Sequence, residues 1–599
     1  MKSILLAGVC AVLLASPVVA AAPAAKPEAS ADARFKAIYT KEWAWRNNQF
    51  GDSEDTPSDG RKVAHYLPHE DPATHAKRLA YWTDVLKQLD AIQPSSLSEP
   101  ERVNYAIYRI QIENLAADER FHTWEMPFNS DSSFWANLAG IARRPMHTVD
   151  DYRGYIAQLN DMPRYFREEI ADMRAGLARG FSVPRASIEG RDQSIADVAG
   201  QTAPETNVFW YPFAHMPASI SAADQAALKA EAAKAITSSV VPAHQELLKF
   251  AREEYWPKTR KTLAAEAMPD GVAFYRQQIK EYTTLDLDPE AIHQTGLNEV
   301  ARIHAEMVET MKATGFKGTF AEFLQYLRTD PKFYAKTPEE LLSRAAWISK
   351  EGDGKIPEYF GHAPRGRFQI IPVPPSIAPY YTSGRGGAHT YWLNTYDLPH
   401  RPLYNLTALT LHEAEFGHAF QLSLAEEQTD LPAFRRESYI SAYGEGWGLY
   451  VEKLGKEMGL YVTPYDEFGR ETYEMWRACR LVVDTGIHHK GWTREQAINY
   501  LAENTALPHH EIETEVDRYI TWPAQALSYK LGEMDILRNR ARAEKALGPK
   551  FDIRAFHDTV LALGSVPLPV LDARIDQFIA DGGKGPYALP GGQRHAPAG

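Results

Sequence analysis

Residues 411–421, LHEAEFGHAFQ, contain two histidines and two glutamates, side chains that can bind a metal ion and use it. In the H-E-x-x-H zinc motif the two imidazoles lie four residues apart on one helix face. Here His412 and His418 are six residues apart, which places them about 240° apart around a regular α-helix. They can share one ion only if the helix is broken near Phe416 and Gly417. Because a π-bulge accommodates one extra residue, we expect a larger break.

A third ligand is expected in the segment SAYGEGWGLYVEKLG. Two histidines, one carboxylate and an open position make a catalytic zinc site when no thiolate is available. Glu445 lies at the start of a predicted helix, 27 residues after the second histidine, a separation that suits two antiparallel helices. Glu452 falls on the same face of that helix. It either orients a ligand or forms a surface pair with Lys453 or Lys456, and the sequence leaves both open.

The elements that must position these residues are mainly helical. Apolar residues recur at three- and four-residue intervals through most of the chain. The least helical part is 351–381, and it leads to AHTYWLNTYD at 388–397, the best strand candidate. The helical pattern returns at Leu403 and continues to about Ala580. We therefore predict a mainly α protein with a small sheet beside the helix that contains His412.

The first twenty residues, MKSILLAGVCAVLLASPVVA, have the pattern of a signal peptide with cleavage after Ala20. We expect a periplasmic or secreted protein. The apolar run is too short to span a bilayer, and no later stretch has the required length. A lipoprotein would need Cys10 to carry the lipid, and both Val9 and the very short run before it argue against that alternative.

Charge and cysteine content exclude other classes. The formal charge of −13 becomes −14 when Lys2 is removed with the signal peptide, because no acidic residue leaves with it. An acidic exported protein is a poor candidate for nucleic-acid binding. Cys479 is then the only cysteine, which excludes an internal disulfide and a thiolate zinc site.

Several segments resemble a bacterial family catalogued as domain of unknown function 885. The resemblance is carried by LTLHEAEFGHAFQ, AYGEGWGLYVEKLG, RLVVDTGIHHKGWTREQAINYL, DRYITWPAQALSYKLG, NTYDLPHRPLYNL and FHDTVLALGSVPLPVLDARIDQFIA. That family is grouped with the zinc peptidases, and its motif is typically H-E-x-x-P-G-H, so Phe416 stands where proline is usual. The resemblance implies a large, two-lobed, helical zincin-like fold of the gluzincin type, with a deep central cleft. In outline it is similar to angiotensin-converting enzyme and the helical carboxypeptidases.

The resemblance also implies roles around a Zn²⁺ ion. His412, His418 and Glu445 would hold the ion. Glu413 would take a proton from the zinc-bound water and deliver it to the leaving amine. Glu415 is a rival base, although the family pattern favours Glu413.

Donors to the substrate are expected from two further segments. The Arg518-Tyr519 pair resembles that of the converting-enzyme family, in which the tyrosine hydroxyl stabilises the oxyanion. Tyr519 is therefore the first choice and Tyr529 the second. His488 is a candidate donor to a substrate carbonyl, with Asp484 able to set its tautomer.

The sequence offers several candidates for binding the substrate peptide. Arg518, Lys530 and Lys490 are available for a peptide carboxylate, and the sequence does not choose among them. The strand at 388–394, which contains Tyr391, could pair with an extended substrate by edge addition.

These expectations combine into one hypothesis, an exported zinc metallopeptidase for short peptides, carboxypeptidase- or dipeptidase-like. The alternatives are a catalytically silent periplasmic peptide-binding protein and a zinc hydrolase of a non-peptide amide or ester. The natural substrate, exo- or endo-cleavage and the oligomeric state stay open. The predicted organisation is a signal peptide at 1–20, a flexible lead at 21–33, an N-terminal helical part at 34–350, a catalytic part at 351–585 and a disordered tail at 586–599.

Overall fold

The computed structural model describes residues 30–50, 63–130, 132–201, 203–375, 378 and 381–587. The predicted signal peptide lies outside the described residues, as do most of the expected lead and tail. Helix α1 (Ala31–Phe50) begins inside the segment that we expected to be a flexible lead.

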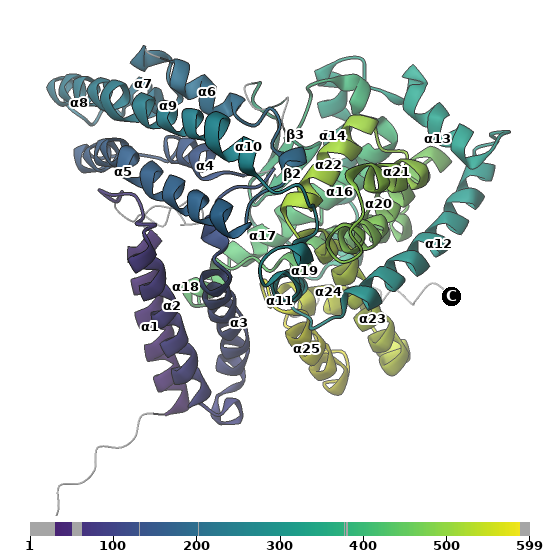
Figure 1. Ribbon diagram of the computed structural model, residues 1–599. Helices are drawn as coiled ribbons and strands as arrows, with labels where there is room; N and C mark the ends of the chain where they lie inside the picture. Colours follow the sequence, from purple (N-terminus) through teal and green to yellow (C-terminus); the bar gives the residue numbers. More distant parts are fainter. Residues whose placement is uncertain are drawn as a thin grey trace, which may run out of the picture.

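The structure is mainly helical, which confirms the predicted class (Figure 1). The helices before residue 360 are α2 (Pro72–Asp90), α3 (Glu99–Phe121), α4 (Phe134–Ile141), α5 (Val149–Arg179), α6 (Gln193–Gly200), α7 (Tyr211–Ala214), α8 (Ala222–Ala235), α9 (Val241–Phe250), α10 (Trp256–Lys258), α11 (Gly271–Thr283), α12 (Pro289–Ala313), α13 (Phe320–Thr329), α14 (Pro338–Asp353) and α15 (Ile356–Tyr359). Those after residue 400 are α16 (Leu406–Glu413), α17 (His418–Glu426), α18 (Ala433–Arg436), α19 (Ser441–Glu457), α20 (Pro464–His488), α21 (Arg494–Asn504), α22 (His509–Thr521), α23 (Ser528–Leu547), α24 (Ile553–Leu561) and α25 (Leu568–Ala580).

A three-stranded sheet lies beside α16, as predicted. Its strands are β1 (Gln369–Pro372), β2 (Gly384–Gly387) and β3 (Thr390–Leu393), in the order β1-β3-β2. Strand β3 pairs parallel to β1 and antiparallel to β2. The predicted strand is therefore the central one, and its backbone groups are used on both sides. Edge addition of a substrate to this strand, which we expected from the sequence, is excluded by that position.

Helix α20 forms the centre of the C-terminal part. Every residue from Phe468 to His488 is buried, including several arginines, glutamates and an aspartate. Helix α12 packs along it, and Gly296 allows the close approach, because a Cβ there would lie 2.8 Å from Leu481 and Val482 side-chain atoms. Buried charged residues are rare unless they are paired or functional, so this helix is the first place to look for a site.

Hydrophobic packing joins distant parts of the chain. One core holds α4 to α9 together, in the upper left of Figure 1. Another combines α1, α2 and α3 with α17, α19 and α23 to α25. Residues before and after residue 350 thus share a core, so the N-terminal helices are held firmly against the C-terminal part.

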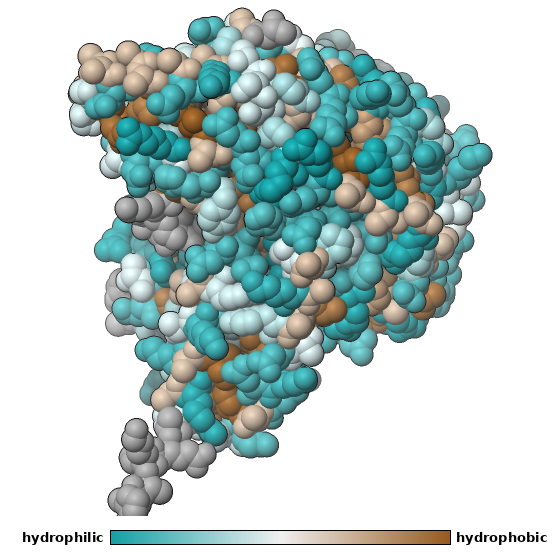
Figure 2. Space-filling model, turned by 60° about the vertical axis from the view of Figure 1, so that its left-hand side comes forward, coloured by the Kyte–Doolittle hydropathy of each residue, from teal (hydrophilic) through white to brown (hydrophobic). Residues whose placement is uncertain are grey.

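One face of the molecule shows how polar and apolar side chains are distributed on the surface. Figure 2 shows a predominantly hydrophilic face with hydrophobic patches between the polar side chains. Within the described ranges, every helix is either too short or too polar to cross a membrane.

Candidate metal centre and its pocket

The helix that contains the two histidines is broken, as their spacing requires. Helix α16 ends at Glu413 and α17 begins at His418. In between, the amide groups of Ala414 and Glu415 both donate to the carbonyl of Thr410, at 3.0 and 3.2 Å. The chain then leaves the helical path instead of continuing through a single π-bulge, which confirms the larger break.

Phe416 and Gly417 make the break possible. Phe416 has φ +72°, an uncommon value for a bulky residue. Its ring is buried and stacks on Phe360 at 5.2 Å, and its carbonyl accepts from Trp447 Nε1 at 2.7 Å. A Cβ at Gly417 would lie 1.8 Å from the carbonyl oxygen of His412, so only glycine fits there. Proline, which the resemblance described above led us to expect at position 416, is locked near φ −65° and could not adopt this backbone.

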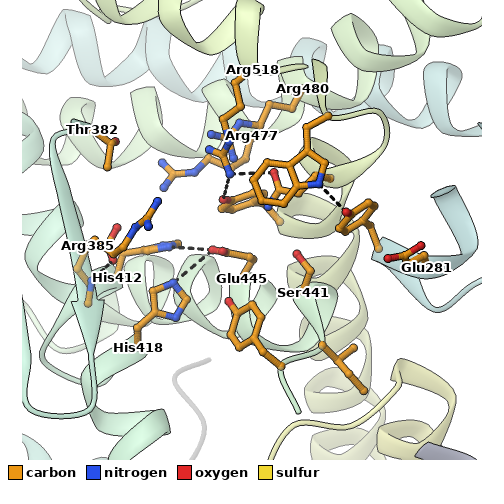
Figure 3. A pocket seen from close by; sticks show the side chains of 18 of the residues that line it. Glu281, Thr382, Arg385, His412, His418, Ser441, Glu445, Arg477, Arg480 and Arg518 are labelled. Carbon is orange, nitrogen blue, oxygen red and sulfur yellow. Dashed lines mark hydrogen bonds and ion pairs between the residues drawn. The ribbon is translucent and has the colours of Figure 1, made fainter. Parts of the chain in front are cut away.

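The break brings three side chains to one point (Figure 3). Glu445 Oε2 lies 3.4 Å from His412 Nε2 and 3.3 Å from His418 Nε2. Ligand atoms bound tetrahedrally to zinc at 2.0–2.1 Å lie roughly 3.3–3.4 Å from one another. These contacts are longer than the roughly 2.7–2.9 Å of an ordinary charge-assisted hydrogen bond. The donor set therefore fits a zinc ion better than a simple ion pair.

Glu452 completes the arrangement around His412. Its Oε1 lies 2.8 Å from His412 Nδ1 and 3.3 Å from Arg477 Nη2, and its side chain is buried. A hydrogen bond from Nδ1 to a carboxylate leaves the Nε2 lone pair available for a metal. Of the two alternatives for Glu452, the structure shows contact with His412, and the side chain is too buried to form the surface pair.

The electrostatics at His412 reflect the same neighbours. Burial lowers the pKa of the imidazole, but the carboxylates of Glu445 and Glu452 outweigh it and raise that pKa to about 10. Burial likewise opposes ionisation of Glu445, yet the two histidines hold the pKa of its carboxyl well below its usual value. The cluster therefore attracts positive charge, as protons or as a metal cation.

Glu452→Gln is expected to weaken zinc binding by about 10- to 100-fold, because loss of the carboxylate makes His412 a poorer and less ordered ligand. Titration against a chromophoric zinc chelator measures the affinity. Glu457→Gln is the matched control, since Glu457 lies at the exposed end of the same helix and pairs with Arg540. Equal affinities for the two variants would contradict the assigned role.

A pocket of about 610 Å³ opens over the three side chains. Residues of α3 and α11 line it together with β2 and with α16, α17, α19, α20, α22 and α23. Glu413 faces this pocket, and its Oε2 accepts from the amide of Gly386 at 2.7 Å. Glu415 is absent from the lining and is buried, and its pKa is raised to about 8 by burial and by Asp353. Of the two candidate general bases, Glu413 therefore lines the pocket and Glu415 does not.

Arginines that sequence reasoning missed line the pocket with Arg518, which it had named. Figure 3 shows Arg385 on one side and Arg477, Arg480 and Arg518 together above the histidines. Arg477 and Arg480 lie one turn apart on α20 and are almost completely buried. The stretch MWRACRLVV, with two arginines among apolar residues and a tryptophan, is the signal that could have indicated them.

Tyr519 does not face the pocket. Its hydroxyl is buried and accepts from Trp476 Nε1 and Arg480 Nε, both at 2.8 Å. The first choice for an oxyanion donor is therefore corrected. Tyr529, the second choice, does line the pocket, and its ring lies 6.3 Å from that of His412. Tyr439, which the sequence analysis missed, also lines it, 6.4 Å from the ring of His418.

His488 is also removed from the substrate. It is fully buried, its Nδ1 accepts from the amide of Ala265, and its Nε2 bonds to the carbonyl of Tyr519 at 2.8 Å. Burial lowers its pKa to about 3. Asp484 does not contact it, since that carboxylate accepts from Tyr275 and from the amide of Ala524. Both expectations for this pair are corrected.

The other predicted substrate-binding residues lie elsewhere. Lys530 is buried and pairs with Glu474 and Glu533. Lys490 pairs with Glu290 and is absent from the pocket lining. Tyr391 is fully buried in the central strand. The expected roles of Lys530 and Tyr391 are corrected for the same reason, because neither side chain reaches the pocket.

Fold and site together define a class, a mainly helical protein with a His-His-Glu cluster at one wall of a pocket. The chain belongs to the family described as "Bacterial protein of unknown function (DUF885)", whose model matches residues 51–575. It is similar to the crystal structure of "the putative lipoprotein from Colwellia psychrerythraea", with 28% identity, a TM-score of 0.83, and coverage of 92% of this chain and 100% of that chain. A structure described as "a putative lipoprotein of unknown function from Shewanella oneidensis" has the same coverage, 20% identity and a TM-score of 0.67, which shows a shared fold alone. No curated protein matches this chain.

Proposed function

We propose that this protein is an exported zinc-dependent metallopeptidase that hydrolyses short peptides. The observation that carries the proposal is the convergence of His412, His418 and Glu445 at separations that suit tetrahedral zinc. In this proposal the fold is a two-lobed zincin-like one, and the pocket is its central cleft. A pocket of this size would hold a few residues of an extended peptide and would exclude folded proteins.

The chain's own residues have distinct tasks in the proposed reaction. When bound, zinc would supply a Lewis acid for the scissile carbonyl and lower the pKa of a water molecule. Glu413, held by the amide of Gly386, takes the proton of the attacking water and returns it to the leaving amine. The hydroxyl groups of Tyr529 and Tyr439, which both line the pocket, are candidate donors to the developing oxyanion.

Export rests on two independent supports. The N-terminal sequence has a signal-peptide pattern with Ala20 at its end. The similar crystal structure from Colwellia psychrerythraea is described as a "putative lipoprotein", and lipoproteins are exported. Mass spectrometry of the mature N-terminus decides between cleavage after Ala20 and lipid attachment at Cys10.

The proposal is tested by metal analysis together with a peptide-library assay. We expect one zinc per chain, cleavage of short peptides, loss of cleavage on chelation and recovery when zinc is restored. Zinc without peptide cleavage, but with cleavage of other amides or esters, identifies the non-peptide hydrolase. Peptide binding without zinc identifies the catalytically silent protein. Either result overturns the peptidase.

A further inference from the structure

Arg480 is held in a fixed position beside the candidate metal centre. Its guanidinium lies between two aromatic rings, with Cζ 4.3 Å from the centroid of Trp476 and 4.1 Å from that of Tyr529. Nε donates to the hydroxyl of Tyr519, and Nη2 donates to Glu515 Oε2, both at 2.8 Å. Stacking and two hydrogen bonds leave the group almost no freedom to turn.

The third nitrogen of the Arg480 guanidinium, Nη1, differs from the other two in its hydrogen bonding. Nη1 is buried and has no hydrogen-bond partner among the described residues, although Arg480 lines the pocket and is only 1% exposed. A buried donor on a charged group is costly when it is left unsatisfied. Because Arg480 lines the pocket, a ligand bound there is a source from which this nitrogen can gain an acceptor.

The charge around this nitrogen is positive. Arg477 and Arg518 line the same part of the pocket as Arg480 (Figure 3). Two carboxylates, Glu452 and Glu515, pair with these three arginines, and Glu452 is shared with His412. Three arginines thus share two carboxylates in these ion pairs, which favours an anion over a neutral acceptor.

We propose that Arg480, assisted by Arg477 and Arg518, binds a carboxylate of the substrate next to the candidate metal centre. A guanidinium recognises a carboxylate with directed, charge-assisted hydrogen bonds. The carboxylate is either the C-terminal group of the peptide or an acidic side chain. That the ligand is a peptide rests on the proposed function, whereas the preference for a carboxylate rests on the arginines alone. Tyr519, which we expected at the oxyanion, instead positions Arg480.

Equilibrium dialysis with zinc-loaded Glu413→Gln protein tests the proposal, because the bound peptides are not consumed. Three tetrapeptide pools are compared. The first has free C-terminal carboxylates and no acidic side chains, the second is the same pool amidated, and the third is amidated with one glutamate in each peptide. We expect the first or the third pool to be retained at least tenfold more than the second, as about 1.5–3 kcal/mol per charged hydrogen bond implies.

Retention of the first pool identifies a C-terminal site, and retention of the third identifies an acidic side chain. Equal retention of all three pools, including retention of none, overturns the inference. The outcome is separate from that of the proposed function, since a protein without hydrolytic activity can still show the carboxylate preference.

Variants locate the preference at Arg480. Arg480→Lys keeps the charge but loses the stacked, planar donors, so we expect the preference between pools to fall to within about threefold. The double variant Arg480→Met with Glu515→Met removes both buried partners and guards against misfolding of the single variant. Arg494→Lys is the matched control, because Arg494 pairs with Asp517 on α22 and is absent from this pocket's lining. A preference that persists in both Arg480 variants, or that disappears in Arg494→Lys, places the anion site elsewhere.

Discussion

Glu413→Gln is expected to lower kcat/KM for peptide hydrolysis by about 10²- to 10⁴-fold and to leave the zinc content unchanged. The amide keeps the size of the side chain and can still accept from the amide of Gly386. It cannot take a proton from water. Activity is measured on the peptides found in the library assay, and metal content by elemental analysis of the same preparation.

Glu415→Gln is the control, two residues away in the same break of the helix. Glu415 is buried away from the pocket, and burial and Asp353 raise its pKa to about 8, so it is mostly uncharged at neutral pH. Replacing it with an amide changes little in charge or shape, and activity should stay within about twofold of the unsubstituted protein. If Glu415→Gln were the inactive variant, the assignment of the base would be reversed.

Gly417→Ala is expected to remove tight zinc binding and to destabilise the fold. The added Cβ would lie 1.8 Å from the carbonyl oxygen and 2.4 Å from the carbonyl carbon of His412. Both are backbone atoms, so the turn that brings the two histidines together has to open. We expect about 3 kcal/mol of lost stability from overpacking and about 100-fold weaker zinc binding. Chemical denaturation and a chelator competition measure the two effects.

Gly200→Ala provides the comparison for that substitution. Gly200 ends α6, and a Cβ there meets no atom within 4 Å. The stability change should therefore stay within about 1 kcal/mol, the range of the helix propensity difference. Zinc binding that survives in Gly417→Ala with normal affinity would mean that the break does not depend on this glycine.

One side chain, Glu452, connects the candidate metal centre with the arginines of α20. Glu452 of α19 contacts a histidine on one side and Arg477 of α20 on the other. A change of charge at the metal centre therefore changes the electrostatic potential at Arg477, in the part of the pocket that would bind a carboxylate. Metal binding and substrate binding should be measured separately in every variant of Glu452 for this reason.

The sequence by itself determined the helical class, the small sheet and the three side chains of the candidate metal centre. Those predictions depend on local periodicity and on which residue types can bind zinc, and both can be read along the chain. The six-residue spacing of His412 and His418 also requires a break in the helix if the two side chains are to share one ion.

Only the tertiary structure decided which side chains share the pocket. Periodicity shows that Tyr519 and His488 lie on helices, but not which helix face meets the pocket and which is buried against a neighbour. The chain also breaks between α22 and α23, so that Tyr529 faces the pocket and Tyr519 does not. Arg480 became a candidate because Trp476 and Tyr529 enclose it and one of its nitrogens has no partner. Contacts of this kind come from packing between segments distant in sequence, which no local pattern records.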